Sequence, residues 1–227
     1  HLESLVRERT RELDAINIGL VSSFERVNEL NDDDTGKHIL RVCEYSRVLA
    51  QSYGLPEMMI QKIHRYASLH DVGKVAISDA ILKKQGSLTE SEWEEMRRHP
   101  TIGYELLKLA GTDPVAQNIA YSHHESWDGT GYPQGLAGED IPIEARIVTL
   151  ADVFDALTTR RCYKPIFSVE KTEEIIRTLR GKHLDPTIVD IYFDKRLEFE
   201  SIRLEYRDTA DSDDDTSVPM ERVKVSA

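Results

Sequence analysis

One segment of the sequence is apolar on nearly every face of a helix. It follows Pro142, covers residues 143–159 and includes the run Arg146-Ile147-Val148-Thr149-Leu150-Ala151-Asp152-Val153-Phe154-Asp155-Ala156-Leu157. A helix that is hydrophobic all round is buried, so we expect this one inside a helical domain. Asp152 lies within it, and a buried carboxylate needs a cation or a dense set of hydrogen bonds. The segment therefore predicts a core and a polar site inside that core.

Helix-starting and helix-ending residues divide most of the remaining chain into further helices. Thr89-Glu90-Ser91-Glu92 is a capping box, while Asp113-Pro114 and Asp185-Pro186 combine an N-cap with Pro at the first helical position. No alternating strand pattern and no internal repeat is present. We therefore predict an all-α helical bundle, with a loop and a helical turn at 75–88 and helices at 35–53, 57–71, 89–98, 101–110, 114–124, 143–159, 169–180 and 186–204.

Residues 1–30 carry apolar side chains at heptad spacing, which is typical of a coiled coil. One heptad position holds Val6, Leu13, Leu20 and Val27, and the other holds Leu2, Ile16 and Leu30. We expect a two-stranded helix that connects the domain to an upstream module and joins two copies into a homodimer. A single amphipathic helix lying on the domain is the alternative. Because the sequence begins with His1 inside this helical pattern, we expect a fragment of a longer protein.

The chain divides into three parts on these patterns. Residues 1–30 are the connector and dimerisation helix, and residues 31–205 are the helical domain. Residues 206–227 are rich in Asp among Thr, Ser and Ala, and such a composition cannot bury enough apolar surface to fold. We therefore expect a disordered acidic tail.

Charge and cysteine content limit the classes of partner. The 227 residues carry a formal net charge of −12, which argues against a polymer of nucleic acid as the ligand. A small anionic ligand would need local positive charge from a few Lys or Arg residues or from a bound metal. The two cysteines, Cys43 and Cys162, make no disulfide framework, and no signal peptide or membrane-length apolar run is visible. These features favour a cytoplasmic protein.

The histidines fall into two groups by their surroundings. For His1, His64 and His183 we expect surface or hydrogen-bonded side chains, and His99 taken alone would be read in the same way. By contrast, the pairs His70-Asp71 and His123-His124 lie at the ends of predicted helices. Asp152 lies on the apolar helix. Inward side chains from several helices build metal sites in bundles. Imidazole and carboxylate without thiolate favour Fe, Mn, Co, Ni or Zn, and the number of ligands suits two ions.

A glycine-rich loop directly follows the second pair. The stretch His123-His124-Glu125-Ser126-Trp127-Asp128-Gly129-Thr130-Gly131-Tyr132-Pro133 ends a predicted helix and continues into this loop. Gly allows a close approach of backbone because it has no Cβ, and Pro fixes φ. We expect the histidines to bind metal and the loop to face a ligand, with Glu125 and Asp128 stabilising the loop or supporting the ligands from behind.

Together these motifs resemble the HD-GYP family of cyclic di-GMP phosphodiesterases, a branch of the HD-domain metal-dependent phosphohydrolases. The resemblance covers about residues 30–200. It rests on His70-Asp71-Val72-Gly73-Lys74, on His123-His124-Glu125 and Asp128 to Pro133, on His99-Pro100 with Gly103, and on Ala151-Asp152 with Asp155-Ala156-Leu157-Thr158, Arg161, Tyr163 and Lys164. The resemblance implies an all-α bundle of the HD-domain type.

The resemblance also implies a ligand set for two divalent ions, most typically Fe or Mn. Asp71 is expected to bridge them, and the implied ligands are His70, Asp71, His99, His123, His124 and Asp152. His38 matches a further ligand in members with an extra metal. Those members have Glu where this chain has Asp34, so a third ion depends on whether the shorter carboxylate reaches it.

The resemblance assigns roles to several other residues. Lys74 matches the lysine near the scissile phosphate, and it would act in catalysis together with Asp71. Arg161 and Lys164 match basic residues that hold the phosphates of the ligand. Gly131, Tyr132 and Pro133 would either line the site, with Tyr132 as a stacking face for guanine, or form a docking surface for partners such as diguanylate cyclases.

The expected function is hydrolysis of cyclic di-GMP to linear pGpG, with GMP as a further product, as the output domain of a bacterial signalling protein. The upstream module would be a receiver or sensor domain. One alternative is a related hydrolase acting on another cyclic dinucleotide or a nucleoside phosphate. The other is a metal-bound module that binds a nucleotide or a partner without turnover.

Overall fold

A computed structural model describes residues 36–159 and 167–207, and within these two ranges the chain forms helices and no strands. The predicted all-α fold is confirmed. The predicted connector helix lies outside the described residues, as do Asp34, Arg161, Lys164 and all of the predicted acidic tail except residues 206 and 207. The helices are α2 (Gly36–Tyr53), α3 (Glu57–Tyr66), α4 (Asp79–Leu82), α5 (Glu90–Met96), α6 (His99–Leu109), α7 (Pro114–Ser122), α8 (Ile143–Thr158), α9 (Val169–Leu179) and α10 (Pro186–Glu205).

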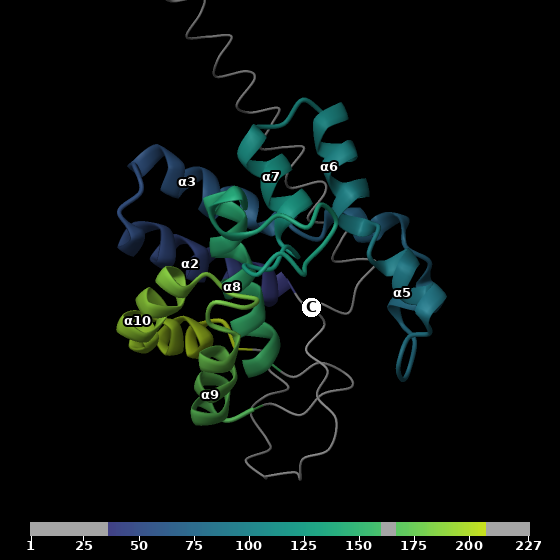
Figure 1. Ribbon diagram of the computed structural model, residues 1–227. Coiled ribbons are helices and arrows are strands. Elements are labelled where there is room, and N and C mark those ends of the chain that lie inside the picture. Colours follow the sequence, from purple (N-terminus) through teal and green to yellow (C-terminus); the bar gives the residue numbers. More distant parts are fainter. Residues whose placement is uncertain (1–35, 160–166, 208–227) are drawn as a thin grey trace, which may run out of the picture.

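The apolar helix identified in the sequence is α8, and it lies at the centre of the bundle (Figure 1). Helices α2, α7, α9 and α10 all pack against it. Its Phe154 ring lies 5.1 Å from those of Tyr45 on α2 and Phe199 on α10, and 5.4 Å from that of Tyr192. Such aromatic contacts add to the stabilisation from buried area. The first and last described helices are therefore fixed to the same central helix.

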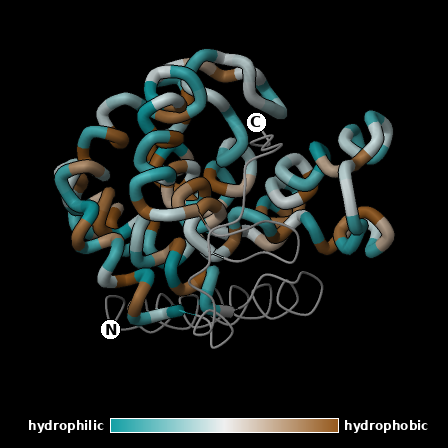
Figure 2. The backbone as a smooth tube through the Cα atoms, turned by 90° about the horizontal axis from the view of Figure 1, so that it is seen from below, coloured by the Kyte–Doolittle hydropathy of each residue, from teal (hydrophilic) through white to brown (hydrophobic). Residues whose placement is uncertain are grey.

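Most of the helices begin within one residue of the predicted start. The exception is α6, which begins at His99 with Pro100 in its first turn, whereas the sequence predicted a break at His99-Pro100 and a helix from residue 101. Thr89 accepts from the backbone N–H of Glu92, whose carboxylate accepts from the N–H of Thr89, so the capping box is present. Asp113 and Asp185 cap α7 and α10 through backbone N–H groups of the first turn. In Figure 2 hydrophobic and hydrophilic segments alternate along the helices, as expected for helices with one buried face. No described helix has the length and apolar character needed to cross a membrane.

The predicted helix over 57–71 is too long. Helix α3 ends at Tyr66, and the chain continues through 3₁₀ turns at Ala67–Leu69 and Val72–Ala76. The reason is packing against α6, because a Cβ on Gly73 would lie 1.9 Å from the carbonyl oxygen of His99. The 3₁₀ turns bring the backbone at Gly73 this close to α6. His70 and Asp71 therefore lie on a bend between these turns and not on an α-helix. The predicted turn within 75–88 is present as α4.

We predict that Gly73→Ala destabilises the domain, because the new methyl group must displace the backbone of α6. The expected loss in free energy of unfolding is on the order of 1–3 kcal/mol, as in other overpacked sites. Gly103→Ala is the matched control, since its Cβ would meet its nearest atoms at 3.2 Å and the neighbours need to give much less. Chemical denaturation measures both. Equal stability of Gly73→Ala and the unmodified protein would contradict the packing argument.

Candidate metal centre

Side chains predicted as metal ligands converge at one place, although they come from five separate segments. The central helix α8 provides one of them, and α2 another from its first turn. The others come from the 3₁₀ turns after α3, from the start of α6 and from the end of α7. In chain order these residues are His38, His70, Asp71, His99, His123, His124 and Asp152.

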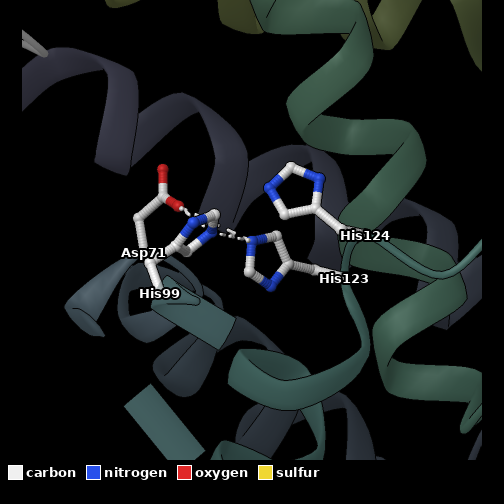
Figure 3. Close-up of side chains that lie close together, drawn as sticks. All are labelled: Asp71, His99, His123 and His124. Carbon is white, nitrogen blue, oxygen red and sulfur yellow. Dashed lines mark hydrogen bonds and ion pairs between the residues drawn. The ribbon is translucent and has the colours of Figure 1, made fainter. Parts of the chain in front are cut away.

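The seven side chains form two clusters. Asp71, His99, His123 and His124 form the first, which Figure 3 shows, and their ligand atoms all lie within 4.8 Å of one another. His38, His70 and Asp152 form the second by the same distance. Imidazole nitrogens and carboxylate oxygens at this spacing suit divalent transition metals. The structure thus adds a division into two groups that the sequence did not indicate.

The carboxylate of Asp71 lies between the two clusters. Its Oδ1 is 3.2 Å from Nε2 of His99 and 3.5 Å from Nε2 of His123. Its Oδ2 is 3.3 Å from Nε2 of His70, which is also 4.0 Å from Oδ1 of Asp152. Each oxygen of one carboxylate therefore faces a different cluster, as would be needed if Asp71 were to be shared by two ions.

The histidine rings are held from behind by hydrogen bonds at Nδ1. In three of them Nδ1 faces a backbone carbonyl of the preceding turn, and in the fourth it faces a carboxylate. A carbonyl can only accept, so Nδ1 carries a proton, and Nε2 is the atom that faces the centre and can bind a metal once it is unprotonated. The contacts are His70 to Ala67 O at 2.8 Å, His99 to Met96 O at 2.8 Å, His123 to Ile119 O and Ala120 O at 3.1 Å, and His38 to Asp155 Oδ2 at 2.7 Å.

Two buried atoms in the centre show that a cation fits there. Nε2 of His70 and Oδ1 of Asp71 are buried and make no hydrogen bond with any residue of the described ranges. Leaving such groups unsatisfied costs about 1–3 kcal/mol each, and more for a charged group. An ion in the first cluster would satisfy Oδ1 of Asp71, and an ion in the second would satisfy Nε2 of His70. The donor set and the burial therefore agree with the expected metal site.

The charges of the centre depend on one another. Burial raises the pKa of Asp71, but the positive charges of Lys74 and His70 outweigh it and hold that pKa well below the usual value. Burial lowers the pKa of His70, yet the carboxylates of Asp71 and Asp152 raise it to about 9. Burial and the neighbouring imidazoles hold the pKa of His124 well below its usual value. The bridging carboxylate is thus ionised, and His124 is neutral and able to bind a metal.

Lys74 lies beside the bridging carboxylate. Its Nζ is 2.8 Å from Oδ2 of Asp71, and both side chains are 16% exposed. The ammonium group is therefore next to both clusters and partly shielded from water. A positive charge in this position can interact with an anionic ligand bound at the centre.

The glycine-rich loop covers the first cluster. The Tyr132 ring stacks on His124, with ring centroids 4.8 Å apart and planes 18° apart, and the Arg97 guanidinium carbon lies 5.8 Å from the centre of the Tyr132 ring. A Cβ on Gly131 would lie 2.2 Å from the backbone nitrogen of Ser126, so only Gly fits there. The Tyr132–Pro133 peptide is cis. The predicted stacking face is thus partly occupied by a histidine of the centre.

The two acids of this loop stabilise it, as expected from the sequence. Glu125 is buried and accepts hydrogen bonds from the backbone N–H groups of Gln134 at 2.7 Å and Leu136 at 3.0 Å. Asp128 accepts from the backbone N–H and the hydroxyl of Thr130. Neither carboxylate belongs to the two clusters.

The remaining described histidines are hydrogen-bonded, as expected. His183 contacts the Ser126 hydroxyl at 2.9 Å, and His64 contacts Glu44 at 2.9 Å.

Sequence reasoning assigned no role to three residues behind the centre. Asp155 and Arg41 form a buried ion pair next to His38, and the Thr149 hydroxyl lies 2.8 Å from the carbonyl oxygen of His123. A signal for the first was present, because Asp155 is a second acid on the apolar helix and lies three residues after Asp152. A second charge on a buried helix needs its own partner.

A family model agrees with this architecture. The model of the HD domain matches residues 19–188, which is most of the chain. The chain belongs to the HD domain family. The matched residues include all seven side chains of the two clusters.

Curated relatives in this HD domain family are similar over most of the chain. A cyclic di-GMP phosphodiesterase of Vibrio cholerae is 42% identical over 205 residues, covering 84% of this chain and 42% of the relative. A 3'3'-cGAMP-specific phosphodiesterase 2 of the same organism is also 42% identical, and the match covers 81% of this chain and 36% of the relative. The cyclic di-GMP phosphodiesterase response regulator RpfG of Xanthomonas campestris is 42% identical, and the match covers 87% of this chain and 51% of the relative. The chain thus spans about half the length of these relatives or less.

Solved structures show the same fold. A cyclic GMP-AMP specific phosphodiesterase of V. cholerae has a TM-score of 0.64 at 20% identity, covering 86% of this chain and 52% of that one. An HD-GYP protein of Bdellovibrio bacteriovorus, Bd1817, has a TM-score of 0.57 at 25% identity, covering 74% and 55%. The expected HD-GYP type of the domain is therefore confirmed.

We predict that Asp71→Asn lowers the metal content of the protein by more than half, because both clusters lose their shared anionic ligand. Elemental analysis of protein loaded with Mn(II) and then desalted measures the content per chain. Asp79→Asn is the control, since that side chain is 71% exposed, belongs to neither cluster and forms an ion pair with the surface residue Lys83. Full metal content in Asp71→Asn would contradict the bridging position.

Proposed function

We propose that the chain is a metal-dependent phosphodiesterase that hydrolyses cyclic di-GMP to linear pGpG, with GMP as a further product. The observation that carries this proposal is the pair of clusters joined by Asp71, with Lys74 at 2.8 Å from the shared carboxylate. The names of relatives 42% identical to the chain support the choice of substrate.

The centre would hold two divalent ions, for which we propose Fe or Mn. Asp71, His99, His123 and His124 would hold one, and His38, His70 and Asp152 the other, with Asp71 shared between them. When bound, such a pair lowers the pKa of a water molecule and binds the oxygens of a phosphate. A third ion would depend on Asp34, where the shorter carboxylate replaces the usual Glu.

The residues of the chain would contribute orientation and charge. The Nδ1 hydrogen bonds of the histidines fix their rings before any ligand arrives, so no reorganisation is needed during the reaction. Lys74 would neutralise the negative charge that develops on the phosphate. Arg161 and Lys164 would hold the phosphates of the ligand, and Gly131 to Pro133 would contact its guanine end. This local positive charge is what a chain of net charge −12 needs in order to bind an anion.

The domain would act as the cytoplasmic output of a signalling protein. Residues 1–30 would form a helix that joins two copies and connects them to an upstream receiver or sensor module, and residues 206–227 an acidic tail. The response-regulator name of one relative supports a receiver. The loop ending in Pro133 would also offer a docking surface for diguanylate cyclases.

A second candidate substrate is 3'3'-cGAMP. A relative named for specificity toward it has the same 42% identity as those named for cyclic di-GMP. The metal clusters act on the phosphodiester rather than on the base, so they do not separate the two nucleotides. A binding module without turnover would be favoured by a missing ligand. The seven side chains that we propose as ligands all belong to the two clusters, which supports an enzyme.

We predict that protein loaded anaerobically with Fe(II) or Mn(II) cleaves cyclic di-GMP faster than 3'3'-cGAMP and cyclic di-AMP. Chromatography of the products at equal substrate concentrations, with metal analysis of the same samples, measures this order. Faster cleavage of 3'3'-cGAMP would replace the proposed substrate by the second candidate. Metal-loaded protein that leaves every cyclic dinucleotide intact would support the binding module instead.

We predict that Lys74→Met lowers kcat by roughly 10²–10³-fold, because a preorganised charge at the phosphate is lost. The metal content should stay near that of the unmodified protein, since Lys74 is not in either cluster. Lys83→Met is the control, as this lysine is a surface residue 48% exposed. An unchanged kcat in Lys74→Met would remove the residue from the mechanism.

A further inference from the structure

His38 differs from the other anchored histidines of the centre in what lies behind it. Its Nδ1 is 2.7 Å from Oδ2 of Asp155, whereas the others face backbone carbonyls. Both side chains are buried, Asp155 being 1% and His38 4% exposed. Asp155 belongs to neither cluster, yet it lies on α8 one turn after Asp152, the carboxylate that His38 faces with Nε2 at 3.8 Å. A buried charge thus stands directly behind one proposed metal ligand.

Arg41 holds Asp155 from the other side. Its Nε donates to Oδ1 at 2.6 Å and its Nη2 donates to Oδ2 at 3.0 Å, while Nη1 donates to the carbonyl oxygen of Tyr206 at 2.8 Å. Guanidinium has donors and no acceptor, so both oxygens of Asp155 accept and the carboxyl group is ionised. An ionised carboxylate has no proton to give. The hydrogen bond to His38 must therefore use a proton on Nδ1 of the imidazole.

We propose that Asp155, itself held by Arg41, is a positioning residue that keeps the proton of His38 on Nδ1 and thereby leaves Nε2 as the metal-binding atom. A backbone carbonyl can do this at His70 and His99 because those rings lie next to their own preceding turn. His38 is the third residue of α2 as described, and its Nδ1 faces a carboxylate of another helix, α8, instead. The proposal rests on the proposed metal centre and is independent of the substrate.

An Asp155→Asn substitution would reverse this arrangement. The amide has one acceptor and one donor end, and both ends would face Arg41. Arg41 donates to Oδ1 at 2.6 Å and to Oδ2 at 3.0 Å. An NH₂ group at the position of Oδ1 would therefore lie closer to an Arg41 donor, so the oxygen of the amide should stay at that position. The NH₂ group then takes the position of Oδ2 and donates to Nδ1 of His38. The proton of the imidazole moves to Nε2, where it blocks metal binding.

The test compares metal affinity in two buried Asp→Asn variants. Asp185 is the matched control, because it is also buried and also paired with an arginine on α8, Arg146, at 2.6 Å. Titration of the full chain with Mn(II) should show affinity roughly 10–100-fold weaker in Asp155→Asn, the usual effect of removing a partner of a ligating histidine. Asp185→Asn should keep the affinity of the unmodified protein. Unchanged affinity in Asp155→Asn would overturn the proposal.

A second measurement needs no variant and does not depend on the stability of one. In the zinc-loaded protein, long-range ¹H–¹⁵N spectra of the histidine side chains should show the proton of His38 on Nδ1 and Nε2 bound to metal. A proton on Nε2 would overturn the role of Asp155. A protein that binds no metal at all would overturn the proposed metal centre, which separates the failure of the two proposals.

Discussion

The rest of the structure depends on placing the ionised carboxylate of Asp71 inside a helical core. A charge taken out of water must be compensated by donors or cations, and single contacts cannot do so. Here α6, α7 and the turn after α3 bring histidine and lysine nitrogens to its two oxygens. The close contact between the turn and α6, which requires Gly73, is what allows this approach. Packing and electrostatics therefore specify the same backbone path.

In the centre, one set of buried contacts supports the next. Backbone carbonyls and Asp155 orient the imidazoles, and the imidazoles and carboxylates then form the two clusters. The loop from Gly129 to Pro133 covers the first cluster, where the Tyr132 ring stacks on that of His124. Because each layer is fixed by buried contacts, the ligand atoms have little freedom to move when a metal or nucleotide arrives. This is the preorganisation on which electrostatic catalysis relies.

The sequence predicted those features that follow from local rules. The capping residues located the helix starts, and Asp152 in an apolar helix indicated a buried cation site. It could not predict the pairing of ligands into two clusters, because that depends on how α2, α6 and α8 cross. The end of α3 at Tyr66 also escaped prediction, since tertiary contact with His99 overrides helix propensity there. Asp155 was missed because a buried ion pair has the same sequence appearance as a buried metal ligand.

The contact of Arg41 with the end of α10 brings the two ends of the described domain together. Arg41 and Lys37 on the first turns of α2 donate to the carbonyl oxygens of Tyr206 and Arg207. The chain thus enters and leaves the described domain beside His38, at one wall of the metal centre. A pull or twist applied to either end reaches a metal-facing side chain within a few residues. A displacement at either end of the described domain would therefore act on this wall of the centre without passing through the hydrophobic core.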